Sequence, residues 1–164
     1  MAGEAGFGAI LSTLNDHEVE YCIVGMLAAV LQGAPAVTVD VDIVHRRTPD
    51  NVSRLLAALR ALDAEYRNDP RHLTPQESHL LGPGHQLLRT RHGDLDVLGS
   101  IAGGDFETLV DATVLLDLQG VPVRVLELSR VIAAKMAAGR PKDLAALPML
   151  RATLDEIRKR RKAP

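Results

Sequence analysis

Residues 37–45 read VTVDVDIVH, a run of β-branched residues that carries two aspartates, Asp40 and Asp42. β-Branched side chains favour a strand, and successive side chains of a strand point to opposite faces. The two carboxylates therefore share one face of the expected strand, opposite Val39 and Val41. The apolar face is suited to a protein core, so the acidic face is the first candidate for a functional site.

A second segment repeats this arrangement. In GDLDVLG, residues 93–99, Asp94 and Asp96 share a face opposite Leu95. If the two strands are neighbours, three or four carboxylates lie together and repel one another unless a cation lies between them. Mg²⁺ prefers such oxygen ligands, and two ions held by shared carboxylates assist nucleotidyl transfer. The alternative is a set of acids that point outward from half-solvated strands.

The composition is that of an ordinary globular protein. The chain has 164 residues, a formal net charge of −2, 46% hydrophobic residues and 2% aromatic residues, which suits one domain over residues 1–164 with its core at about 20–150. The small charge and the scarcity of aromatic side chains give no general reason to bind nucleic acid. The N-terminus has no basic segment and no apolar run is long enough to span a membrane, so we expect a cytoplasmic protein with no membrane partner.

Hydrophobic periodicity and turn residues predict alternating helices and strands. The expected order is helix 5–17, strand 19–25, helix 26–33, strand 37–44, helix 48–64, strand 86–92, strand 94–98, helix 105–113, a hairpin over 114–128 that turns at Gln119-Gly120, helix 129–139 and a last helix from Pro141. Thr48, Asp105 and Ser129 are the expected N-caps. Residues 66–85 show no clear period and are expected to be a loop, with or without an edge strand. The fold class is therefore α+β, with a mixed sheet flanked by helices.

The segment VGMLAAVLQG, residues 24–33, places Gly25 between a strand and a helix. A glycine lets a phosphate approach the backbone, and the free N–H groups at a helix start attract an anion. The same strand-to-helix turn is also a common structural joint, so this segment alone does not identify a phosphate site.

Three segments together resemble a known family: IVGMLAAVLQGAPAVTVDVDIV at 23–44, LDVLG at 95–99 and VIAAKMAAGRPKD at 131–143. They resemble the minimal nucleotidyltransferases of the DNA polymerase β-like superfamily, in particular the AbiEii-type group of toxin–antitoxin and phage-defence systems. The likeness extends from about Tyr21 to Leu147.

The resemblance implies the nucleotidyltransferase fold and a role for each matching residue. Gly25 would form the glycine turn at the nucleotide, while Asp40 and Asp42 would hold two Mg²⁺ ions. Asp96 would be the third catalytic acid, which shares a metal and helps to activate the attacking hydroxyl. Asp94 is a possible fourth acid.

The last matching segment adds basic residues to the implied site. Lys135 would point toward the nucleotide phosphates, and Arg140, Lys142 and Asp143 would lie near the site or hold their helix in place. From the residues alone, Lys135 is one exposed lysine of an amphipathic helix. The sequence departs from the family at Met26, because the family has serine or glycine there, and a methionine could crowd a phosphate.

The implied activity is transfer of a nucleoside monophosphate from a nucleoside triphosphate, such as ATP, to a hydroxyl. The implied acceptor is a transfer RNA end or a protein side chain, and the implied partner is an antitoxin or another restraining protein. Two alternatives stay open: a non-catalytic module that keeps the fold and binds a nucleotide or a partner, with Met26 as the sign of lost chemistry, and an α+β domain whose acids only face solvent.

Other candidate residues carry less functional information. Cys22, the only cysteine, is expected to be a core thiol. The histidines lack the short paired spacings of a zinc site, and His45 is expected either at a solvated strand end or near a phosphate. The tail at 158–164 has five consecutive basic residues, at 158–162, that either complement a helix dipole in solvent or contact phosphates.

Overall fold

A seven-stranded mixed sheet forms the centre of the computed structural model, which describes residues 2–163 and the side chains from residue 6 onward. The strands are β1 (Tyr21–Val24), β2 (Asp40–His45), β3 (Glu65–Tyr66), β4 (His85–Thr90), β5 (Gly93–Leu98), β6 (Thr113–Leu118) and β7 (Val121–Leu126). Their order across the sheet is β3-β4-β5-β2-β1-β7-β6. β2 runs parallel to β5 and β1 runs parallel to β7, whereas the other neighbours are antiparallel. The predicted α+β fold with a mixed sheet is confirmed.

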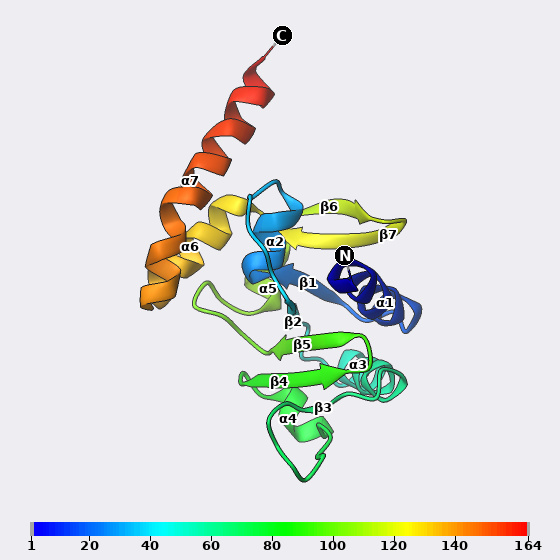
Figure 1. Ribbon diagram of the computed structural model, residues 1–164. Coiled ribbons are helices and arrows are strands. Elements are labelled where there is room, and N and C mark those ends of the chain that lie inside the picture. The colour runs from blue at the N-terminus through cyan, green and yellow to red at the C-terminus, as the bar shows by residue number, and fades with distance from the viewer. Residues whose placement is uncertain (1, 164) are drawn as a thin grey trace.

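Helices lie on both sides of this sheet (Figure 1). They are α1 (Ala2–Asp16), α2 (Gly25–Leu31), α3 (Pro49–Ala61), α4 (Glu77–Leu81), α5 (Phe106–Leu109), α6 (Leu128–Ala138) and α7 (Pro141–Lys162), with a 3₁₀ turn at Val110–Ala112. α1 packs against α3, and α2 packs against β1, β2 and α6. α7 packs against α6 and extends beyond the rest of the molecule (Figure 1).

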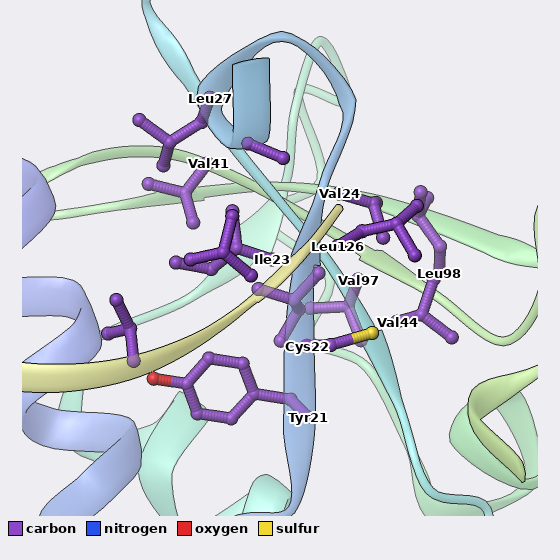
Figure 2. Close-up of a cluster of buried hydrophobic side chains, with 14 of the residues drawn as sticks. Tyr21, Cys22, Ile23, Val24, Leu27, Val41, Val44, Val97, Leu98 and Leu126 are labelled. Carbon is purple, nitrogen blue, oxygen red and sulfur yellow. The ribbon is translucent and has the colours of Figure 1, made fainter. Parts of the chain in front are cut away.

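The core is aliphatic, as the low aromatic content predicts. All four residues of β1 are buried, and Figure 2 shows them among side chains of the neighbouring strands and of α2. Cys22 lies inside this cluster, and its burial raises the pKa of the thiol to about 12. The expectation that Cys22 is a core thiol is confirmed.

Three local predictions are also confirmed. The side chain of Thr48 accepts a hydrogen bond from the N–H of Asn51 at the start of α3, and Asp105 accepts one from the N–H of Thr108 at the start of α5. Gln119 and Gly120 both have positive φ, 53° and 87°, which is the geometry of a type I′ hairpin turn between β6 and β7.

Some boundaries differ from the sequence prediction. β2 begins at Asp40 rather than at residue 37, and Val37 and Val39 are 92% and 72% exposed, because the strand finds sheet partners only from Asp40 onward. The break between β4 and β5 lies at residues 91–92, since Gly93 already pairs with Thr90.

The predicted N-cap at Ser129 is wrong. α6 begins after Glu127, and the free N–H of Leu128 donates to Gln32 Oε1 at 3.0 Å. A side chain from the end of α2 therefore takes the place of a local cap, which no local pattern could indicate.

The region 66–85 has more structure than predicted. β3 lies at the sheet edge, and α4 forms where a loop was expected. His45 Nε2 donates to the carbonyl oxygen of Leu80 in α4 at 2.7 Å. His45 is therefore buried, which lowers its pKa, and the expected solvated strand end is wrong.

The basic tail forms the exposed last turns of α7, where Lys159, Arg160, Arg161 and Lys162 complement the helix dipole. Residue 164 of that predicted tail lies outside the described residues. Within residues 2–163, no helix combines the length and apolarity that membrane crossing requires.

Asn51 joins the start of α3 to the ends of β1 and β2. Its amide nitrogen donates to the carbonyl oxygens of Glu20 and Arg46 at 2.9 and 2.8 Å, and its amide oxygen accepts from the N–H of Glu20 at 2.7 Å. Because the side chain is fully buried, water could not replace the Asn51 amide as the hydrogen-bond partner of these backbone groups.

We expect Asn51→Leu to lower the free energy of unfolding by about 2–4 kcal/mol, because it leaves buried backbone groups without partners. Urea unfolding monitored by circular dichroism measures this change. Ser53→Leu, at an exposed position of the same helix, is the matched control and should change stability by less than about 0.5 kcal/mol. Equal effects of the two substitutions would contradict a special role for the Asn51 amide.

Candidate metal centre

The parallel register of β2 and β5 brings the two acid pairs together. Asp40 lies beside Asp94 and Asp42 lies beside Asp96, and paired residues on neighbouring strands face the same side of the sheet. One carboxylate oxygen from each of Asp40, Asp42 and Asp96 lies within 4.8 Å of the others. We call these three residues the acidic triad.

Burial and mutual repulsion hold the triad in an unfavourable electrostatic state. Burial, followed by the charge of Asp96, raises the pKa of Asp42 to about 7. The same two causes raise the pKa of Asp40. In addition, Asp42 Oδ1 is buried and has no hydrogen-bond partner. The triad therefore has an oxygen, and an excess of negative charge, that its protein neighbours do not satisfy.

Arg67 supplies the nearest positive charge to the third acid. Its Nη2 donates to Asp96 Oδ1 at 2.8 Å, and its Nη1 lies 3.3 Å from Asp94 Oδ2. Asp94 also lies 3.7 Å from Arg89 Nε. Asp94, the predicted fourth acid, is thus held in ion pairs beside the triad rather than within it.

Gly25 lies directly against the triad. Its φ is +65°, a conformation that favours glycine, and a Cβ at this position would overlap Asp42 Oδ2. The predicted glycine turn is therefore present and leaves bare backbone next to a carboxylate. Met26 is partly buried and packs against the hydrophobic core, so at least part of this side chain is directed away from solvent.

A basic cluster borders the triad from α6 and α7. Asp143 is 1% exposed and accepts from Arg140 Nε at 2.6 Å and from Lys135 Nζ at 3.4 Å. These hydrogen bonds lower the pKa of Asp143, and the bond from Arg140 has the largest effect. The charge of Lys135 acts on Asp42 and that of Lys142 acts on Asp40, each as a minor influence that lowers the pKa of its carboxyl. The charges of Lys135, Arg140 and Lys142 therefore act on the triad, and Asp143 links α6 to α7 through Lys135.

The residues of the triad suit a hard divalent cation. Carboxylate oxygens are the ligands that Mg²⁺ and Mn²⁺ prefer, and the unpartnered Asp42 Oδ1 is a buried oxygen that an ion would satisfy. A bound cation would also relieve the repulsion that raises the pKa of Asp42.

Sequence reasoning missed Arg67. It follows the two-residue edge strand β3 in a segment with no clear periodicity, so nothing local links it to acids 27 and 29 residues away. Only the order β3-β4-β5 in the sheet brings it there.

The raised pKa of Asp42 predicts how the metal-free protein responds to pH. A carboxyl whose folded pKa exceeds its unfolded value stabilises the fold below the unfolded pKa, near 4, and this stabilisation is lost as pH rises through about 7. With EDTA present, the wild type should lose roughly 2 kcal/mol more stability between pH 5 and pH 8 than Asp42→Asn does. Urea unfolding of both proteins at the two pH values measures the difference, and identical pH dependence would contradict it.

Gly25 and Gly139 offer a matched pair of substitutions, because both have a φ of +65°. An added Cβ at Gly139 would lie 3.7 Å from the carbonyl oxygen of Met136, an ordinary contact, whereas at Gly25 it meets Asp42. Gly139→Ala should therefore cost about 1 kcal/mol from backbone conformation alone, and Gly25→Ala about 2 kcal/mol or more. Chemical unfolding in EDTA compares them, and an equal cost would show that Asp42 does not restrict this turn.

Comparison with known proteins identifies the fold. No protein-family description matches the sequence, and no curated protein sequence matches it. Among solved structures, the chain is similar to the antibiotic-resistance factor ANT(2'')-Ia, with a TM-score of 0.61, 13% identity and coverage of 92% of this chain and 83% of that one. It is also similar to TM1012 of Thermotoga maritima, which is assigned as a nucleotidyltransferase, with a TM-score of 0.57, 17% identity and coverage of 92% and 91%.

A third similar structure is an antigenic nucleotidyltransferase-like protein of Paracoccidioides brasiliensis, with a TM-score of 0.53, 20% identity and coverage of 90% and 74%. At these identities the likeness concerns the fold and not the reaction. The chain therefore has the fold of the nucleotidyltransferases, as the resemblance in its sequence implies.

Proposed function

We propose that this chain is a metal-dependent nucleotidyltransferase, which moves a nucleoside monophosphate from a nucleoside triphosphate to a hydroxyl acceptor. The observation that carries the proposal is the acidic triad itself: three carboxylates on two parallel strands, with oxygens within 4.8 Å of one another, beside a glycine turn. A buried oxygen of Asp42 also has no hydrogen-bond partner, and a bound cation would supply one.

In the proposed reaction, the acceptor oxygen attacks the α-phosphorus, the bond from that phosphorus to the β-phosphate oxygen breaks, and pyrophosphate leaves. Divalent cations bound by the triad, Mg²⁺ in our proposal and two in number, supply positive charge that offsets the charge of the phosphates. Asp40 and Asp42 are the metal ligands. Asp96 is a ligand, and it also orients the acceptor hydroxyl and takes its proton.

The residues around the triad position the triphosphate. Gly25 leaves the backbone beside Asp42 free of a side chain, so that a phosphate can approach it. Lys135 is held by Asp143 at the border of the site, with 16% of its side chain exposed, and we assign it to the phosphates. Arg140 pairs with the same carboxylate at the start of α7, and the pair of Lys135 with Asp143 joins α7 to α6.

The acceptor classes are carried over from the family resemblance. They are a transfer RNA end and a protein side chain. In this proposal, the chain acts as the toxic half of a toxin–antitoxin pair. Incubation with α-labelled nucleotide, Mg²⁺ and either total RNA or total protein separates these classes by the fraction that becomes labelled.

The first test of the function is nucleotide binding. We expect a nucleoside triphosphate with Mg²⁺ to raise the melting temperature of the wild type by about 5 °C or more near a hundred times its dissociation constant. Asp42→Asn should abolish this shift. Differential scanning fluorimetry with each of the four nucleotides, with and without Mg²⁺, measures both effects.

The matched control is Asp155→Asn, which removes an exposed carboxylate of α7 and should keep the full shift. A shift that survives Asp42→Asn would place the nucleotide elsewhere. A Mg²⁺-dependent shift without pyrophosphate release in the presence of acceptor would instead favour the alternative, a non-catalytic nucleotide-binding module in which Met26 replaces the small residue of the family.

A further inference from the structure

Arg67 is held at the edge of the triad by contacts of its backbone and of its guanidinium group. Its backbone N–H donates to the carbonyl oxygen of Leu87 at 3.0 Å, and its Nη1 donates to that of Leu88 at 3.2 Å. The side chain thus reaches from the edge strand β3 across β4 to the acids of β5. Only 15% of it is exposed, so it is a built part of the site rather than a surface arginine.

The guanidinium interacts with a carboxylate oxygen of each of the two acids of β5. It is bonded to Asp96 Oδ1 and lies close to Asp94 Oδ2. Burial alone would lower the pKa of Arg67, but the charges of Asp96, Asp94 and Asp40 raise it. A permanent positive charge therefore lies beside a carboxylate that the proposed function assigns to a divalent cation.

We propose that Arg67 is the internal counter-cation of this site: it competes with divalent cations for Asp96 and stabilises the fold when no metal is bound. The inference rests on the proposed function, because it concerns how the triad takes up its ion. Arg67 is a positioning residue, since it acts through Asp96 and Asp94 rather than on the substrate itself. It makes metal uptake weaker than three carboxylates alone would allow.

The test uses the full chain and Mn²⁺ as the probe, in isothermal titration calorimetry without nucleotide. Removing one positive charge next to the ligands should tighten the Mn²⁺ dissociation constant in Arg67→Gln by roughly tenfold. Without metal, the same variant should melt at a lower temperature than the wild type, and Mn²⁺ should raise its melting temperature by more than it raises that of the wild type.

The matched control is Arg71→Gln, which makes the same change of charge in the same segment. Arg71 pairs with Asp69 and its side chain is 72% exposed, so its variant should bind Mn²⁺ like the wild type. If Arg67→Gln does not fold, Arg67→Lys provides the test. Lysine keeps the charge but lacks the planar fork that spans two carboxylates, so its dissociation constant should be tighter by roughly threefold.

A dissociation constant for Mn²⁺ that is unchanged or weaker in the Arg67 variants overturns this role of Arg67. The same titration with Asp42→Asn separates that result from failure of the proposed function. A wild type that binds no Mn²⁺, or binds it equally well after Asp42→Asn, overturns the metal site itself. Binding that depends on Asp42 but not on Arg67 overturns only the inference about Arg67.

Discussion

Repulsion among three carboxylates is the constraint around which this molecule is organised. The parallel pairing of β2 and β5 places Asp40, Asp42 and Asp96 at one point of the sheet, and their charges oppose the folding that brings them there. A sheet assembled only for stability would have apolar or neutral residues at these positions. The fold tolerates the cost because 38 buried hydrophobic residues, counted among the side chains that the structure describes, form a continuous core under and around the strands, which leaves enough stability for a strained site.

The surroundings of the triad reduce this repulsion without removing it. Arg67 bonds to Asp96, and the charge of Lys135 acts weakly on Asp42. Asp143 pairs with both Lys135 and Arg140, so its single negative charge offsets part of the positive charge of α6 and α7 near the site. Asp42 is left with a raised pKa and an unpartnered oxygen, so its ionised form is the one that a bound cation would stabilise. A site left in this state is suited to bind a cation and, through it, a polyanionic nucleotide.

Local sequence patterns were sufficient to predict features that depend on neighbours in the chain. Alternation predicted that Asp40 and Asp42 share a face, and turn chemistry predicted the hairpin at Gln119-Gly120. Features set by distant partners could not be predicted in this way. Arg67 reaches Asp96 only because of the strand order, and Gln32 caps α6 across 96 positions of sequence. β2 was predicted to begin three residues too early, because β-branched residues favour extended backbone whether or not a partner strand is present.

Crystals grown with Mn²⁺ and a non-hydrolysable nucleoside triphosphate would test the role of the triad most directly. Diffraction data collected at the manganese edge would locate the ion without reference to any assumed chemistry. We predict an anomalous peak bonded to oxygens of Asp40, Asp42 and Asp96, with the triphosphate next to Gly25. Well-ordered triad side chains with no manganese between them, or manganese and nucleotide bound at another surface, would contradict the proposed function.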